Sequence, residues 1–304
     1  VSDPHVLVRR EALVALKKLG AREHVGVLEP ALTDEESSVR VAAALGLEKL
    51  NTARTPGLLL NTLVRDGRYM MKEAVLRVFA SLKDHALPDI RKGLESPHQP
   101  VREVCVRALS ANGFDNALSF LLKAAKDPDY RVRYYALSGL GLIPDPKATQ
   151  ALIEALDDET STVQLWAARK LGERASKRPS TFRHGTWEET SALAERRQWP
   201  EMPVDQYQAA LFRLERLFRE YGDGCTRADA AWGWRAVGDS LLKFGEVGRQ
   251  RLEAMRTQKQ DRWLAWAAYE VLFSPMAVDR VTLLTEEQAI ENHRRFAPPF
   301  PRGR

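Results

Sequence analysis

The chain of 304 residues is long enough for one extended array of helices or for two ordinary domains, and its hydrophobic content of 44% is typical of a folded protein. No apolar run approaches the roughly 20 residues that a helix needs to cross a bilayer, so we expect no membrane insertion. The formal net charge of +5 arises from 46 basic and 41 acidic residues. This is a mixed surface rather than the strong positive imbalance typical of nucleic-acid-binding domains.

Cysteine, histidine and glycine patterns indicate neither a metal centre nor a catalytic site. The two cysteines, Cys105 and Cys225, are too few for a disulfide framework and favour a reducing compartment such as the cytoplasm. The six histidines are scattered, and neither His-x-x-x-His nor Cys-x-x-Cys occurs. A Gly-x-Ser-x-Gly elbow and a phosphate-binding glycine loop are also missing from the sequence. We therefore predict no metal and no cofactor, and favour a chain that is not itself an enzyme.

The first half of the sequence repeats one phrase, in which an acidic residue precedes the second residue of a Val-Arg dipeptide by six positions. The clearest copy runs from Asp127 to Leu137. The dipeptides and their variants are spaced by 30 to 32 residues and are Val8-Arg9, Val39-Arg40, Met71-Lys72, Val101-Arg102, Val132-Arg133 and Val163-Gln164. The residues six positions ahead are Asp3, Asp34, Asp66, Ser96, Asp127 and Asp158. Such a regular period indicates a stacked repeat.

Each copy predicts a pair of helices. After the dipeptide, apolar residues recur at helical spacing, and a second, shorter apolar stripe follows a break rich in Gly, Asn, Asp or Pro. We predict first helices near residues 5–19, 36–50, 67–83, 99–112 and 129–143, and second helices near 24–33, 56–65, 86–95, 116–126 and 147–157. Neither helix buries its stripe alone, so we expect the pairs to stack into an all-α solenoid with two long faces.

These copies resemble the short HEAT-like repeats first described in phycobilin lyases, whose consensus motif is Asp-Pro-x-x-x-Val-Arg-x-x-Ala-Leu. The copies that begin at Asp3-Pro4 and Asp127-Pro128 match it well, whereas Met71-Lys72 and Ser96-Pro97 depart from it. The resemblance covers residues 1–175, about six helix pairs with the last degenerate, and implies a right-handed α-α superhelix. Proteins with such repeats include scaffolds, chromophore lyases, DNA-alkylation glycosylases, a metal-dependent hydroxylase and accessory modules of larger enzymes.

The sequence changes character after residue 175. Residues 176–203 are rich in turn-forming residues and predict an irregular connection. Residues 204–304 predict a Trp-rich helical region without a repeat, which would cover the apolar face that the last repeat otherwise exposes. Its predicted features are a stripe that ends at Gly222, a helix that begins at Thr226 and uses Gly238 and Gly245 for close contact, a buried helix near 261–273, and a last helix from Thr285 to Phe296.

The constant offset between acidic and basic residues predicts a structural role. Each acidic residue would cap its own helix, or pair with an arginine of its own or the neighbouring copy. One such event in every copy is expected of a contact that stabilises repeats; the alternative is a basic stripe that meets phosphate or an acidic partner. We call this set the acid–base ladder: Asp3, Arg9, Asp34, Arg40, Asp66, Lys72, Arg102, Asp127, Arg133 and Asp158.

Two groups of residues are candidates for binding. Four arginines outside the ladder are freer to face a ligand: Arg10, Arg68, Arg107 and Arg131. The second group lies in the C-terminal half: Trp232, Trp234, Arg235, Trp263, Trp266 and Glu270. These tryptophans would either stack on a sugar or a base or, at their helical spacing, form core. Glu270 would be either a general acid or base with a raised pKa, or a structural carboxylate paired with Arg235 or Arg262.

We predict a non-catalytic scaffold whose concave face binds a protein partner. One alternative is the C-terminal accessory region of a larger bacterial hydrolase, either sulfatase-like or polysaccharide-acting. Another is a nucleic-acid enzyme similar to the DNA-alkylation glycosylases, although the mixed charge makes nucleic acid the least expected partner. The chain begins with Val1 rather than Met. We take this as the mark of a longer protein, so an upstream domain of the same polypeptide is a candidate partner and export stays open.

Overall fold

The computed structural model describes residues 2–19, 25–49, 54–112, 117–176, 202–223, 230–258 and 262–273. Within these ranges every element of regular structure is a helix, and no strand is formed. The predicted all-α repeat fold is therefore confirmed, whereas its right-handed sense stays a prediction. No helix in the described ranges combines the length and the apolar character that crossing a membrane requires.

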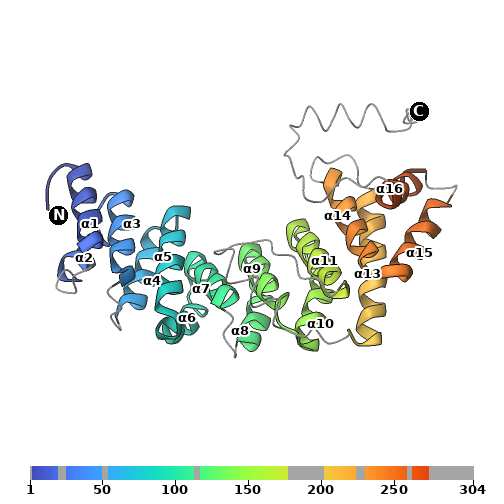
Figure 1. The fold of residues 1–304 in the computed structure, drawn as a ribbon, viewed down its shortest axis with the longest axis horizontal. Coiled ribbons are helices and arrows are strands. Elements are labelled where there is room, and N and C mark those ends of the chain that lie inside the picture. The colour runs from blue at the N-terminus through green and yellow to red at the C-terminus, as the bar shows by residue number, and fades with distance from the viewer. Residues whose placement is uncertain are drawn as a thin grey trace.

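The helices of the repeats lie in two rows (Figure 1). The helices that carry the Val-Arg dipeptides form the inner row: α1 (Val6–Leu19), α3 (Ser37–Gly46), α5 (Tyr69–Leu82), α7 (Gln99–Asn112), α9 (Tyr130–Leu140) and α11 (Ser161–Ala175). The helices between them form the outer row: α2 (Val25–Ala31), α4 (Thr55–Arg65), α6 (Leu87–Gly93), α8 (Ala117–Ala124) and α10 (Pro146–Glu154). Short 3-10 turns follow α3, α5 and α10: η2 (Leu47–Lys49), η3 (Lys83–Ala86) and η4 (Ala155–Asp157). These bounds agree with the predicted helices to within a few residues.

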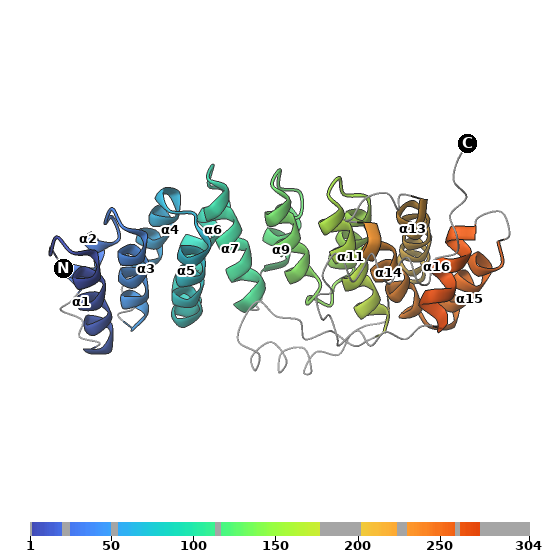
Figure 2. The same cartoon turned by 90° about the horizontal axis from the view of Figure 1, so that it is seen from above.

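The stack bends toward the inner row. Consecutive inner-row helices pack directly on one another, from α1 on α3 to α9 on α11, whereas outer-row helices touch their row neighbours less extensively. Figure 2 shows the inner-row helices standing side by side along the molecule. Close packing on one side and wider spacing on the other produce a curved stack of helix pairs. The inner row therefore lines the concave face.

A continuous hydrophobic core lies between the two rows. The first residue of the repeat dipeptide belongs to it in copies two to six, where its exposed fraction is at most 3%: Val39, Met71, Val101, Val132 and Val163. Gly139 allows α9 to approach its neighbours, because a Cβ there would lie 2.5 Å from Ser110 Oγ and 2.8 Å from Leu121 Cδ1. The repeat phrase thus supplies one core residue for each inner-row helix.

Four further helices follow the repeats: α13 (Val204–Asp223), α14 (Ala230–Leu242), α15 (Gly245–Arg256) and α16 (Arg262–Phe273). Helix α13 packs on the outer-row helix α10, and α14 packs on the inner-row helix α11. Arg213 Nη1 of α13 donates to the Ile153 carbonyl oxygen and pairs with Asp157, both at 2.9 Å. The two rows therefore continue beyond the last repeat that the sequence reveals.

Gly238 and Gly245, both predicted to allow close helix contact, have different roles. A Cβ at Gly238 would lie 2.5 Å from Val271 Cγ2 and 2.9 Å from Phe218 Cε2, so this glycine allows the contact. Gly245 has no atom within 4 Å of the equivalent position and instead adopts a φ of +71°. Positive φ is the conformation that glycine tolerates and other residues disfavour. The predicted reason for Gly245 is therefore wrong.

Several predicted features lie outside the described residues. They include all of the irregular connection except residues 176, 202 and 203, the helix start at Thr226, and the last helix from Thr285 to Phe296. The division of the chain into residues 1–175, 176–203 and 204–304 stays a prediction.

Candidate binding surface

Arg40 and Asp66 illustrate how one repeat is joined to the next. Arg40 Nη1 donates to the carbonyl oxygens of Asp34 (2.6 Å) and Glu35 (2.8 Å), in the turn that precedes its own helix. Arg40 Nε donates to Asp66 Oδ2 in the following repeat at 3.1 Å. The Asp66 side chain is fully buried, and that of Arg40 is 7% exposed. One guanidinium therefore fixes its own turn and holds the next repeat.

The same contact recurs at three other junctions. The distances from Nε to Oδ2 are 2.9 Å for Arg9 with Asp34, 2.8 Å for Arg102 with Asp127 and 2.8 Å for Arg133 with Asp158. Each of these arginines also donates to two carbonyl oxygens of its own turn. The acidic side chains accept the backbone N–H two residues further on, as Asp34 does from Glu36 at 2.9 Å. This local bond stabilises the turn ahead of the helix.

The junction after the third copy departs from this pattern, as its sequence does. Ser96 stands where the other copies have Asp, and Lys72 stands in place of Arg. Lys72 Nζ pairs instead with Glu103 Oε2 of α7 at 2.6 Å. In the last copy, Gln164 Nε2 donates to the Asp158 carbonyl oxygen at 2.7 Å and so keeps the bond to its own turn.

Hydrogen bonds keep the carboxylates of Asp34 and Asp66 ionised. The hydrogen bond from Arg9 is the main cause that lowers the pKa of Asp34. Burial on its own raises the pKa of Asp66, but hydrogen bonds from Arg68, Ser37 and Arg40 outweigh it, and the pKa lies well below its usual range. At neutral pH these groups are charged and engaged within the fold.

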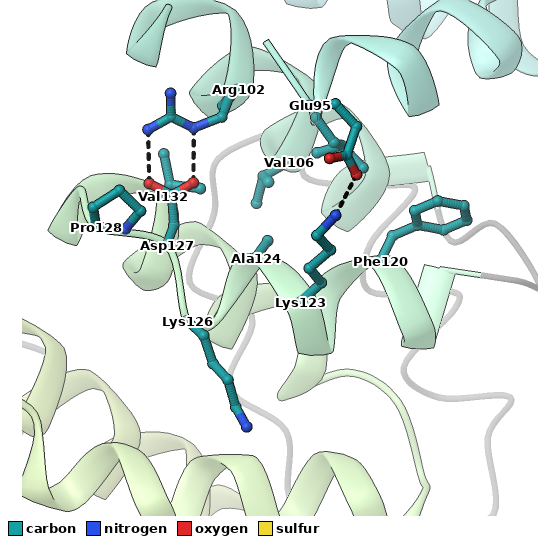
Figure 3. Close-up of a pocket in the computed structure, with 11 residues that line it drawn as sticks. Glu95, Arg102, Val106, Phe120, Lys123, Ala124, Lys126, Asp127, Pro128 and Val132 are labelled. Carbon is teal, nitrogen blue, oxygen red and sulfur yellow. Dashed lines mark hydrogen bonds and ion pairs between the residues drawn. The ribbon is translucent and has the colours of Figure 1, made fainter. Parts of the chain in front are cut away.

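A small pocket of about 290 Å³ lies between α7, α8 and the turn ahead of α9 (Figure 3). Two of its charged groups, Arg102 and Asp127, belong to the ladder, and Lys123 pairs with Glu95 at 2.6 Å. Lys126 points away from the other lining residues. The remaining lining is mainly apolar: Leu94, Val106, Phe120, Ala124, Pro128 and Val132. A second hollow, of about 740 Å³, lies between α8 and α10. The first pocket therefore lies beside the repeat junction formed by Arg102 and Asp127.

A strip of aromatic and charged side chains crosses the inner-row helices α5, α7, α9 and α11. On α5, Glu73 accepts a hydrogen bond from Arg107 Nη2 of α7 at 2.6 Å. The Arg107 guanidinium lies over the ring of Tyr135 on α9, 4.9 Å from its centroid. Tyr135 meets Tyr134 edge-on, with ring centroids 5.1 Å apart. Three helices therefore contribute to one line of contacts.

The strip continues onto α11 through Trp166. Its ring centroid lies 4.8 Å from that of Tyr134. The cations of Arg169 and Lys170 lie 5.3 and 5.0 Å from the indole centroid, and both pair with Glu173, at 3.0 and 2.9 Å. We call the whole set the inner strip: Glu73, Glu103, Arg107, Tyr134, Tyr135, Trp166, Arg169, Lys170 and Glu173.

The inner strip combines half-buried aromatic rings with buried or half-buried charged groups that are balanced in sign. Burial raises the pKa of Tyr134 and of Tyr135, and it lowers the pKa of Lys170 although Glu173 opposes this. The set contains three carboxylates, those of Glu73, Glu103 and Glu173, and three cations, those of Arg107, Arg169 and Lys170. The arrangement presents aromatic rings whose orientation is fixed by paired charges.

Three of the four arginines predicted to bind a ligand are exposed. The side chains of Arg10, Arg68 and Arg131 are 41%, 67% and 52% exposed, and each lies beside an acidic residue close in sequence. Arg107, the fourth, has a side chain that is only 8% exposed. Neighbouring inner-row helices cover Arg107 with Glu73 and Tyr135.

The predicted C-terminal cluster is described in part. Trp234 is 7% exposed and packs edge-on against Phe218, with ring centroids 6.4 Å apart. It therefore belongs to the core and not to an open stacking surface. Arg235 follows it on α14 and is partly exposed. The side chains of Trp232, Trp263, Trp266 and Glu270 lie outside those that the structure describes, so their roles stay predictions.

Of the inner strip, sequence reasoning singled out Arg107 and missed the other residues. The sequence signal for the strip lies in the two residues that directly follow the repeat dipeptide and precede the next alanine. Those positions hold Tyr134 and Tyr135 in the fifth copy and Leu165 and Trp166 in the sixth. Aromatic residues at these variable positions mark the concave side of the stack.

The described residues hold no cluster of three or more His, Cys, Asp or Glu side chains that would bind a metal. Cys105 is fully buried, and burial raises the pKa of its thiol. A thiol with a raised pKa is a poor nucleophile.

Comparison with known proteins identifies the repeats. The family of HEAT repeats matches residues 1–80 and 118–182. No curated protein sequence matches the chain. Among solved structures, Escherichia coli YibA shares 15% identity over 90% of this chain and 90% of its own, with a TM-score of 0.45. The CpcE–CpcF complex of phycocyanin lyase from a Nostoc species shares 26% identity over 64% of this chain and 77% of its own, with a TM-score of 0.29. A designed armadillo repeat protein shares 16% identity over 81% of this chain and 98% of its own, with a TM-score of 0.36.

All of these TM-scores are below 0.5, so nothing about ligands or activity follows from them. The regular ladder, the two rows of helices and the family match agree with one another. Residues 1–80 and 118–182 of this chain belong to the HEAT repeat family.

Proposed function

We propose that this chain is a non-catalytic interaction module that binds a protein partner along its inner row. The observation that carries the proposal is the inner strip, in which rings from Tyr135 to Trp166 touch one another and are flanked by stacked cations. A curved stack of helix pairs presents an extended concave face. The inner strip crosses four neighbouring helices of that face.

The residue types of the inner strip suit a protein interface. Tyr, Trp and Arg are enriched at the centres of such interfaces, where each buries a large area. The rings of Tyr134 and Trp166 are already held by their neighbours. Covering them therefore costs little conformational freedom, which favours tight binding.

The charges of the inner strip favour a protein over nucleic acid. Glu73 and Glu173 pair directly with the cations of the strip, so a phosphate backbone would meet a carboxylate beside each cation. A protein segment that carries both signs of charge is the better match. If the chain is the accessory region of a larger hydrolase, the same face would contact another domain of that polypeptide.

Site-specific photo-cross-linking tests the proposal. A photoreactive phenylalanine analogue replaces Tyr134, and the matched control replaces Gln150, which is exposed on the outer-row helix α10. In cells that make the protein naturally, we expect a discrete protein adduct from position 134 and none from position 150. The captured protein is then titrated against the parent chain and against the Tyr134→Ala/Trp166→Ala variant. We expect the affinity to fall about thirtyfold, as for hot-spot residues worth about 2 kcal/mol.

Three results would each overturn the proposal. The first is an adduct of equal yield at both positions. The second is a captured protein whose affinity for the folded double variant is unchanged. The third is binding of labelled duplex DNA at low salt that Arg169→Gln weakens, which would favour nucleic acid instead.

A further inference from the structure

The third junction, which joins copy three (α5 and α6) to copy four (α7 and α8), lacks most of the contacts that close the other junctions. At each of those, an arginine binds two carbonyl oxygens of its own turn and a carboxylate of the next copy. Lys72 instead makes one polar contact within the described part of the chain, the ion pair of 2.6 Å with Glu103. The Ser96 hydroxyl accepts the His98 N–H at 3.2 Å, which keeps the local turn, but forms no hydrogen bond with Lys72.

An arginine fork and a lysine hold two repeats with different rigidity. Arg102 presents Nε and Nη2 to the two carboxylate oxygens of Asp127 at 2.8 and 2.9 Å. Such a paired contact fixes the relative orientation of the two groups as well as their distance. The ammonium group of Lys72 is a point charge at the end of a flexible four-carbon stem, so it keeps its contact with Glu103 over a range of helix positions. The third junction therefore constrains distance more than orientation.

The packing of the inner row is also reduced at this place. Helix α7 packs much less extensively on α5 than on α9. The ion pairs that cross from α5 to α7 are those of Lys72 with Glu103 and of Glu73 with Arg107, both at 2.6 Å. The hydrophobic core nevertheless continues across the junction. A change of angle between α5 and α7 is therefore easier here than at the other junctions, whereas separation of the two copies is opposed by the core.

We infer that the third junction is the hinge of the stack, about which copies one to three and copies four to six turn as two blocks. Hinge motion of this kind is concentrated at a few positions between units that are themselves well joined. Glu73 lies in the first block, and its partner Arg107 lies in the second with Tyr135. Turning about the hinge therefore changes how the α5 end of the inner strip meets the rest of it. The hinge is independent of the proposed function, because it requires no partner.

Distances between nitroxide spin labels test the inference. One pair of labels is placed at Asn61→Cys on α4 and Ser119→Cys on α8, and the control pair at Ser119→Cys and Gln208→Cys on α13. All three sites are exposed on outer-row helices. Each pair has one outer-row helix between its labelled helices, but only the first pair spans the third junction. Cys225 is changed to Ser in every chain, and Cys105 is kept because it is fully buried.

We expect the distance distribution of the first pair to be at least about twice as broad as that of the control pair. Lys72→Arg with Ser96→Asp should narrow the first distribution to the width of the control and leave the control unchanged. Glu103→Gln, which removes the carboxylate that holds Lys72, should broaden only the first. Equal widths for the two pairs in the otherwise unchanged chain would overturn the inference. So would a broad first distribution that neither the repair nor Glu103→Gln alters, because the motion would then arise elsewhere.

Discussion

The guanidinium of Arg40 and the carboxylate of Asp66, in consecutive repeats, form an ion pair that is almost fully buried. The same guanidinium binds two carbonyl oxygens of its own turn, so the pair links the turn of one repeat to the position of the next. Three other junctions are built in this way. Because the stability of a repeat array depends on the interfaces between neighbours, we expect these ion pairs to control how the stack unfolds.

Removing the buried carboxylate should be strongly destabilising. We expect Asp66→Ala to lower the free energy of unfolding by about 3 kcal/mol, because it leaves the Arg40 charge buried without its partner. Arg68 also binds Asp66 but is 67% exposed, so Arg68→Ala should cost less than about 1 kcal/mol. Urea unfolding of the two variants measures the difference. Equal losses would contradict a special role for the buried pair.

Acid should weaken the stack through the same carboxylates. The folded-state pKa values of Asp34 and Asp66 are lowered from the ordinary value of 3.8. Their contribution is therefore fully present above the unfolded pKa, and it is lost as pH falls toward the folded values. We expect the free energy of unfolding to be steady between about pH 7 and 5 and to fall below about pH 4. In Asp34→Asn/Asp66→Asn the curve should be flatter; a curve as steep as that of the parent chain would show that other groups dominate.

The junction after the third copy can be repaired. Lys72→Arg with Ser96→Asp restores both ladder residues, and we expect a gain of about 1 kcal/mol from the new charge-assisted hydrogen bonds. Lys72→Arg alone should gain little, because no acidic residue stands at position 96. A double-mutant cycle measured by urea unfolding isolates the coupling between the two sites. Purely additive effects would mean that the junction does not form.

The repeat period predicted the fold well because each copy carries its own turn and its own core residue. The inner-row helices follow directly from the dipeptides, and the fixed offset of Asp and Arg pointed to contacts within or between copies. The continuation of the two rows into α13 and α14 was not predictable in this way. Residues 204–242 lack the repeat phrase, and α13 is joined to the stack by contacts such as Arg213 with Asp157.

Apart from Arg107, the inner strip escaped prediction for a different reason. Its contacts join residues about one period apart, such as Glu73 with Arg107 and Tyr134 with Trp166. Such residues become neighbours only when helices stack, and nothing in a single helix distinguishes them. Arg107 was expected to be freer to face a ligand because it lies outside the ladder, and stacking places it against Glu73 of α5 and Tyr135 of α9.

Glycine positions in the second half should respond to substitution for separate reasons. Gly238→Ala should cost about 1–3 kcal/mol, because its methyl group would overlap Val271 and Phe218. Gly245→Ala should cost about 1 kcal/mol through its positive φ. Gly26 lies within α2, where a Cβ would have no atom within 4 Å, so Gly26→Ala is the matched control and should stabilise the helix by up to about 1 kcal/mol. Thermal or urea unfolding of the three variants gives the comparison; a neutral Gly238→Ala would contradict the packing between α14 and its neighbours.

Arg107 should affect both the stability of the stack and the pKa of Tyr135. It binds Glu73 and lies over Tyr135, so Arg107→Ala should lower the free energy of unfolding by about 1–3 kcal/mol, whereas Arg10→Ala at an exposed site should change it by less than about 0.5 kcal/mol. Burial raises the pKa of Tyr135, and the charge of Arg107 opposes that rise. Removing the charge should therefore raise the pKa of Tyr135 further, which spectrophotometric titration of the tyrosines would detect. Stability lost without any change in that titration would mean that Arg107 supports the stack but does not tune the ring. A second variant, Arg107→Met, separates packing from electrostatics, because it keeps most of the apolar contact of the side chain while removing its charge.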